Sequence, residues 1–298
     1  MPMSFNQSVI EQFRAGGGKV GGPFEGGDLL LLTTTGARSG TEHTTPLGYV
    51  RHDGLLLIVG SNLGAPRHPD WYHNLLAHPQ VRVEVGTETF AAIAVPAEGA
   101  RRDRLFAHVV SAAPGYGDYQ AATTRTLPVV ALERVAEENP REITSVADKL
   151  LEVHTWLRAQ LRHVRAEAEA HFAAHQGPGD PALPGLGFQI RQHCLAFCQS
   201  LEFHHTSEDA HMFPGLAAHH PHLRGTLDRL RDEHRTVSRI KSELLAHLAD
   251  ITTADPARFL AELDCMAEEL TTHLDHEEKT LIPTLAAIPF PPRAPGAA

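Results

Sequence analysis

Two short stretches of this chain repeat one arrangement of histidine, glutamate and proline. In residues 203–214 (FHHTSEDAHMFP) and 273–283 (HLDHEEKTLIP), a histidine is followed four positions later by a glutamate, and then by an apolar pair and a proline. Positions i and i+4 lie on one face of a helix. His204 with Glu208, and His273 with Glu277, therefore each offer an imidazole and a carboxylate to one point. Two such copies on two helices could hold one metal ion, or two.

The surrounding sequence places these residues on the buried faces of helices. After Asn139 the chain is almost free of strand patterns, and breakers at 176–181, 213–221 and 249–256 separate four long helical patterns. Apolar residues recur every three or four positions in each, which predicts an antiparallel four-helix bundle. Six polar residues occupy positions on these apolar stripes where leucine is expected: His154, His204, Glu208, His234, His273 and Glu277.

A shared metal centre explains this placement. One histidine on an apolar stripe is more often a core residue, but here all four helices carry one, and unpaired buried carboxylates such as Glu208 and Glu277 are costly. Imidazole and carboxylate ligands without thiolate suit iron, with manganese or zinc as alternatives. A single tetrahedral zinc ion would leave ligands over, and the chain has no His-Glu-x-x-His motif.

The order His-x-x-x-Glu twice, plus a lone histidine on each remaining helix, resembles the hemerythrin-like (HHE) cation-binding family over residues 141–288. The resemblance implies an oxo- or hydroxo-bridged di-iron centre, with Glu208 and Glu277 as bridges and the four histidines as terminal ligands. Oxygen-carrying relatives use five histidines, so a set of four implies an open position for O2, peroxide or NO. Four neighbouring residues are expected to lie off the ligand face: His205, Asp209, His211 and His276.

Residues 1–137 have a different pattern, of short strands linked as hairpins. Strands are predicted at 29–33, 44–51, 55–60, 81–85, 89–95 and 128–132, and helices at 8–14, 70–78, 97–110 and 118–124. Such strands favour a small antiparallel β-barrel over a parallel sheet. The segment 34–40 is either a plain surface turn or an anion-binding loop, in which Gly36, Ser39 and Gly40 expose backbone amides and Arg38 adds a charged donor.

Several segments of this first part together resemble the deazaflavin-dependent nitroreductase and quinone reductase family. They are 17–21, 33–40, 44–47, 61–65, 68–75, Tyr116, 119–120 and 125–129. The resemblance implies a split β-barrel that binds the reduced deazaflavin coenzyme F-420 and transfers hydride to a quinone, a nitro compound or a similar electrophile.

The same resemblance implies roles for individual residues. Residues expected to bind the coenzyme are Lys19, Gly36, Arg38, Ser39, Gly40, Ser61, Asn62, Trp71 and Asn74, and those expected to act in catalysis are Ser61, Tyr116 and Tyr119. Aromatic packing is the alternative for Trp71 and the two tyrosines. Relatives usually carry basic residues where this chain has Glu42, a carboxylate that would repel an anionic coenzyme tail.

Charge and composition exclude some other functions. The net charge of -10 is spread over both parts of the chain, so nucleic-acid binding is not expected. There is no apolar run near the length of a membrane span and no signal peptide, and three cysteines in 298 residues fit a reducing cytoplasm. A quinone substrate would bring peripheral contact with a membrane.

The sequence therefore predicts an α+β protein of two domains, a split β-barrel over 1–137 and a four-helix bundle over 141–288. We expect an F-420-dependent oxidoreductase joined to a di-iron domain that binds or senses O2, peroxide or NO. The alternative, favoured by Glu42, is a non-enzymatic oxygen or iron sensor with a degenerate reductase domain.

Overall fold

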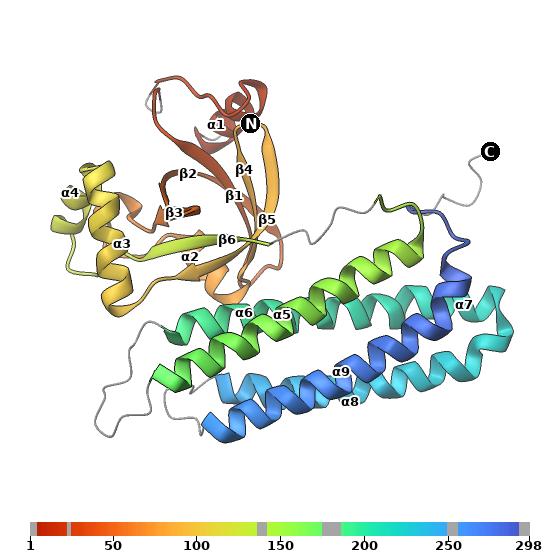
Figure 1. The fold of residues 1–298 in the computed structure, drawn as a ribbon. Coiled ribbons are helices and arrows are strands. Elements are labelled where there is room, and N and C mark those ends of the chain that lie inside the picture. Colours follow the sequence, from red (N-terminus) through yellow and green to blue (C-terminus); the bar gives the residue numbers. More distant parts are fainter. Residues whose placement is uncertain (1–4, 23–24, 136–141, 175–185, 249–255, 292–298) are drawn as a thin grey trace. The chain divides into compact units, whose positions relative to one another are not determined.

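The computed structural model describes residues 5–22, 25–135, 142–174, 186–248 and 256–291 (Figure 1). The chain divides into two compact units, residues 1–136 with 181–196, and residues 137–180 with 197–298. The predicted boundary at 137–140 lies outside the described residues. So do most of the predicted breaks at 176–181 and 249–256.

The first unit is a closed six-stranded antiparallel barrel. Its strands are β1 (Leu29–Thr35), β2 (Glu42–His52), β3 (Leu55–Val59), β4 (Gln80–Val85), β5 (Glu88–Pro96) and β6 (Val129–Arg134). Their order around the barrel is β1-β2-β3-β6-β5-β4, and β4 closes it by pairing with β1, where Leu32 lies opposite Val83. The β2–β3 turn takes the left-handed conformation that tight hairpins favour, with φ of 47° at Asp53 and 79° at Gly54.

Apolar side chains fill the barrel, and short helices flank it. Leu30, Leu32, Ile58 and Val83 are fully buried in one core cluster. The helices are α1 (Phe5–Ala15), α2 (Asp70–Ala77), α3 (Gly99–Ala112) and α4 (Gly115–Ala121), and η2 (Asn62–Gly64) is a short 3-10 turn. The last two helices are shifted by two or three residues from the predicted ranges, since Gly99 and Gly115 begin them.

The second unit is helical. Its long helices are α5 (Val146–Ala174), α8 (Arg224–Leu248), α9 (Pro256–Leu285) and the part of α6 (Leu186–Ser207) that follows Ala196, and they run side by side (Figure 1). At the start of α5, the Asp148 carboxylate accepts hydrogen bonds from the backbone amides of Thr144 and Ser145, while the Ser145 hydroxyl accepts one from the Asp148 amide. This reciprocal capping fixes where the helix begins. A barrel followed by a helical domain confirms the predicted fold class.

The predicted break from Phe213 to Pro221 begins too early, because the helix continues through Pro214. A wide π-turn, η3 (Glu208–Met212), leads into α7 (Phe213–His219), and only then do His220 and the turn η4 (Pro221–Leu223) end the helical path. In the π-turn, the amide of Phe213 bonds to the carbonyl of Glu208. Pro214 then stands in the first turn of α7, where a missing N–H is tolerated.

Across the residues that the structure describes, every helix is too short or too polar to cross a membrane.

Candidate metal centre and coenzyme site

The six predicted metal ligands are buried and lie together in the bundle. His154 comes from α5, His234 from α8, and His204 and Glu208 from the end of α6 and the start of η3. His273 and Glu277 stand one turn apart on α9. The side chains of His154 and Glu277 are fully buried, and the other four residues are between 2% and 8% exposed. The apolar stripe therefore predicted the burial of each of these polar residues.

A seventh side chain, His205, belongs to the cluster, which corrects the expectation that it points away. It is 7% exposed, and its ring stacks on that of His234 with centroids 4.0 Å apart. The burial of His205 could have been predicted from the sequence. His204 lies three residues after the buried Leu201 and His205 lies four after it, and a bundle helix buries both positions. The buried stripe is wider than one residue at this point.

The possible ligand atoms form two groups, each within 4.8 Å. One consists of His154, His204, Glu208 and Glu277, and the other of His205, His234 and His273.

The two glutamates lie between these groups. Glu208 has one oxygen 3.3 Å from Nδ1 of His204 and the other 3.5 Å from Nε2 of His234. Oε2 of Glu277 lies 3.4 Å from Nε2 of His154 and 3.8 Å from Nε2 of His273. Each carboxylate thus faces one histidine of each group, which is the arrangement needed to bridge two metal ions.

Most of the inward-facing polar atoms are buried without a hydrogen-bond partner among the described residues. These atoms are both carboxylate oxygens of Glu208 and of Glu277, and Nε2 of His205, His234 and His273. Leaving so many buried acceptors and donors unpaired is costly, and native proteins rarely do it. Metal ions would satisfy all of them, so the donor set fits the iron that the hemerythrin resemblance implies.

Carboxylates outside the cluster orient three of the imidazoles. Nδ1 of His154 lies 2.8 Å from Glu278, Nδ1 of His234 lies 3.1 Å from Asp209, and Nδ1 of His273 lies 3.1 Å from Glu233. A carboxylate can only accept, so each Nδ1 donates and each Nε2 presents its lone pair to the cluster. Outer carboxylates of this kind accompany metal-bound histidines.

Asp209 and His276, which the sequence places off the ligand face, take part in the hydrogen bonds around the ligands. Asp209 holds His234, while His276 shares Glu233 with His273. Both are therefore part of the outer hydrogen-bond network. His211 is exposed, as expected.

Burial also controls the charge of the cluster. It lowers the pKa of His204 to about 3 and that of His205 well below its ordinary value, so both are neutral, the form in which an imidazole can bind a metal ion. Burial and the neighbouring Glu277 raise the pKa of Glu208 well above its ordinary value. Burial also acts to raise the pKa of Glu277, but the nearby His154 outweighs it, and the pKa is lowered. Two carboxylates this close favour a bound cation.

In the barrel, the segment predicted as either a plain surface turn or an anion-binding loop joins β1 to β2. The amide of Ala37 donates to Oδ1 of Asn74 at 3.0 Å, and Nδ2 of Asn74 donates to Thr34 at 3.1 Å. Gly40 has a φ of +65°, and a Cβ on Gly36 would collide with the Ser39 hydroxyl. Arg38 and Ser39 are exposed. The loop is therefore fixed by Asn74 while its charged donor faces solvent.

Glu42 follows this loop, and its charge is paired. The guanidinium of Arg82 on β4 donates two hydrogen bonds to the Glu42 carboxylate, at 3.1 and 2.8 Å. These bonds hold the pKa of Glu42 below its ordinary value. The repulsion that the sequence predicts between Glu42 and an anionic ligand is therefore reduced.

A second loop carries Ser61 and Asn62. Asn62, Leu63 and Gly64 all have positive φ, a conformation that only glycine adopts readily, and the Leu63 side chain is 78% exposed. Arg125 holds this loop by donating to the carbonyls of Gly60, Ser61 and Ala65 at 3.0, 2.6 and 2.8 Å.

The remaining predicted residues are spread over the barrel domain. Trp71 is 6% exposed and packs in the barrel core, in line with the alternative of aromatic packing. Tyr116 and Tyr119 pack edge to face, with centroids 6.1 Å apart, and burial raises the pKa of Tyr116. Gly64 lies against the backbone of Tyr119, so the Ser61 loop and α4 are neighbours. Lys19 is exposed.

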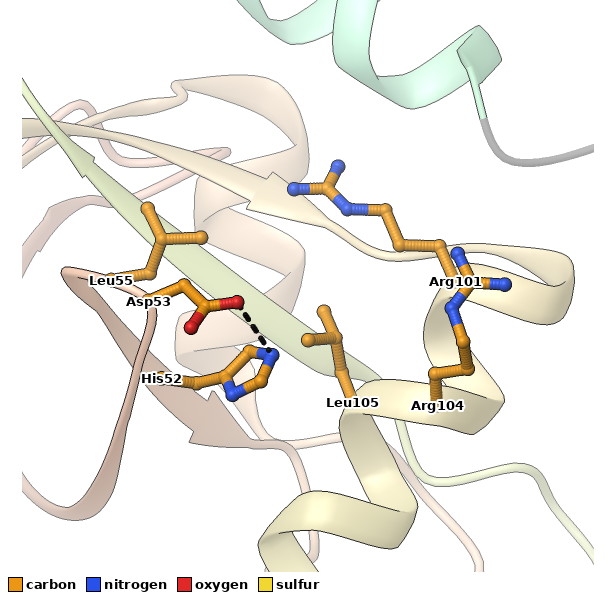
Figure 2. A pocket seen from close by; sticks show the side chains of 6 residues that line it. All are labelled: His52, Asp53, Leu55, Arg101, Arg104 and Leu105. Carbon is orange, nitrogen blue, oxygen red and sulfur yellow. Dashed lines mark ion pairs between the residues drawn. The ribbon is translucent and has the colours of Figure 1, made fainter.

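The barrel domain also has a surface cavity of about 430 Å³ (Figure 2). It is lined by His52, Asp53, Leu55, Arg101, Arg104 and Leu105. Nε2 of His52 lies 3.3 Å from the Asp53 carboxylate. None of the predicted coenzyme residues lines it, so it does not support the coenzyme assignment.

Comparison with known proteins finds one family for the barrel domain and another for the helical domain. Residues 6–134 match the family described as F420H(2)-dependent quinone reductase, and residues 145–285 match the hemerythrin HHE cation binding domain. An F420H(2)-dependent quinone reductase of Mycobacterium tuberculosis is 41% identical over 126 residues, which cover 41% of this chain and 85% of that protein. A solved structure of an F420-H2 dependent reductase is 38% identical, with a TM-score of 0.34, and the match covers 36% of this chain and 94% of that one.

Proposed function

Because this chain belongs to the F420H(2)-dependent quinone reductase family through its barrel and carries a hemerythrin HHE domain after it, we propose that it joins two redox functions. The barrel domain transfers hydride from reduced coenzyme F-420 to a quinone or a similar electrophile. The helical domain holds two iron ions and binds or senses O2, peroxide or NO.

The anion loop is the observation that best supports the reductase function. Its backbone is fixed by Asn74, and Arg38 stands exposed beside Ser39, ready to hold phosphate and carboxylate groups. When bound, the coenzyme supplies the hydride, and the protein supplies position and electrostatics. Ser61 and Tyr119 stand on neighbouring segments, which suits them to the acceptor side.

The alternative of a sensor with a degenerate reductase domain rests on Glu42. The ion pair with Arg82 weakens that reason, because a paired carboxylate repels an anion less than a free one. We therefore favour an active reductase.

The unpaired buried atoms of Glu208 and Glu277 support the metal site. When bound, iron supplies the affinity for small oxygen species, and the surrounding helices exclude bulk water from the ligands. Four histidines and two glutamates are predicted for this role: His154, His204, His234, His273, Glu208 and Glu277.

Two separate measurements test the two halves. Anaerobic titration with reduced F-420 should show binding that weakens in Arg38→Ala and not in Arg104→Ala, which is far from the loop in sequence and lines the surface cavity of Figure 2. Metal analysis should find two irons per chain and a loss of iron in His204→Ala with Glu277→Ala. Unchanged iron in that double variant would show that the ligand set is wrong.

A further inference from the structure

We infer that His205 is a metal ligand, and that it completes a three-imidazole set with His234 and His273 for one ion of a two-metal centre. This inference rests on the metal-binding half of the proposed function. It adds to the six predicted ligands a seventh, which comes from the position directly after His204.

The ring of His205 is in position to bind. His205, His234 and His273 bring nitrogen atoms within 4.8 Å of one another. The ring centroids of His205 and His273 are 5.1 Å apart, and those of His234 and His273 are 4.8 Å apart. Without His205, this group would offer only two imidazoles.

The atom that would bind has no other partner. Nε2 of His205 is buried and has no hydrogen-bond partner among the described residues, as is true of Nε2 of His234 and of His273. A histidine placed here for packing alone would leave a polar atom unsatisfied, and an apolar aromatic residue would pack without that cost. A metal ion explains why the residue is histidine.

The two groups of ligands are unequal. The first group has two imidazoles, His154 and His204, and the second has three when His205 is included, with Glu208 and Glu277 between them. Two ions in such a centre have different ligand sets, so we expect them to bind with different affinities.

The competing explanation is that His205 only supports His234 by stacking, with ring planes 11° apart. The variant His205→Phe distinguishes stacking from metal binding, because phenylalanine retains an aromatic ring for stacking and cannot bind metal. His205→Ala removes both the ring and the nitrogen. His211→Phe is the matched control, since His211 lies in the same stretch and is exposed.

The experiment is anaerobic titration of chelator-treated full-length protein with Co²⁺, followed by visible absorption and by bound cobalt per chain. We expect the natural protein and His211→Phe to bind two ions. We expect His205→Phe and His205→Ala to bind one ion as before and the second at least about 100-fold more weakly, because losing even an outer partner costs about 10- to 100-fold.

If His205→Phe bound two Co²⁺ ions with the affinities and the absorption spectrum of the natural protein, the assignment would be overturned. This holds whether or not His205→Ala binds the second ion. Circular dichroism checks that each variant is folded. Fewer than two ions in the natural protein would instead overturn the two-metal proposal itself, so the two failures are distinguishable.

Discussion

Nδ1 of His154 lies 2.8 Å from Oε1 of Glu278, so a half-buried carboxylate on α9 orients a fully buried imidazole on α5. The same carboxylate oxygen accepts from Arg158 at 2.6 Å. The sequence pattern predicts the histidine. It does not predict its outer partner, although the partner determines which nitrogen faces the cluster.

Replacing Glu278 with Gln should therefore weaken metal binding by about 10- to 100-fold, because the amide no longer fixes the His154 tautomer as a carboxylate does. Asp275→Asn is the matched control, since Asp275 also accepts from Arg158, at 2.6 Å, from a position one turn earlier on α9. The affinity for iron or cobalt is measured in both variants. Equal losses in the two variants would show that Arg158, rather than His154, carries the effect.

The Glu42–Arg82 pair leads to a prediction about coenzyme affinity. Arg82→Met should weaken binding of reduced F-420 by about two- to fivefold, the range of a typical surface charge interaction, because Glu42 is left unpaired near the anion loop. The double variant Arg82→Met with Glu42→Gln should recover the loss. Fluorescence titration measures each affinity.

Arg134→Met provides the control for that series, since Arg134 pairs with Glu88 elsewhere on the barrel. If Arg134→Met weakened binding as much as Arg82→Met, a general effect of net charge would replace our explanation.

Arg125 should be a stabilising residue of the Ser61 loop. Arg125→Met leaves the carbonyls of Gly60, Ser61 and Ala65 without their donor, and we expect it to lower the free energy of unfolding by about 1–3 kcal/mol. Arg67→Met, at an exposed position in the same region, should change it by less than about 0.5 kcal/mol. Urea unfolding compares the two. Equal effects would mean that the carbonyl contacts contribute nothing.

Asp148 gives the fold a pH-dependent contribution to its stability. Hydrogen bonds from the hydroxyls and amides of Ser145 and Thr144 lower its pKa from the ordinary 3.8 to about 2. A carboxyl whose pKa is lower in the folded state stabilises the fold fully above its unfolded value, and that contribution is lost as the pH falls through the folded value.

Asp148→Ala should therefore lower the urea midpoint at neutral pH, and the difference from the natural protein should narrow between about pH 4 and pH 2. Glu152→Ala removes an exposed carboxylate of the same helix, which pairs with Lys149 three residues away, and should show a smaller loss at neutral pH. A difference for Asp148→Ala that did not narrow would argue against the capping role.

Much of the fold follows from local patterns in the sequence. The alternation and hairpin turns of the first part predict the strands, and the stepped apolar residues of the second part predict the helices and the burial of His154 and Glu277. These patterns are local because side-chain direction repeats every two residues in a strand and every 3.6 in a helix.

Features that depend on contacts between distant segments could not be predicted in this way. Arg82 reaches Glu42 because β4 closes the barrel against β1, and Asp209, which lies within the π-turn, contacts His234 on a separate helix. Neither the closure nor the wide turn has a clear local signature. His205 is different, because its spacing of four from Leu201 is visible in the sequence.

The barrel domain should be a working F-420-dependent reductase. The most direct test is anaerobic oxidation of reduced F-420 by the full-length protein with menadione as acceptor, monitored by the return of absorbance of the oxidised coenzyme. We predict oxidation that depends on both protein and menadione and that falls in Arg38→Ala. No menadione-dependent oxidation, together with no binding of the reduced coenzyme, would contradict this function.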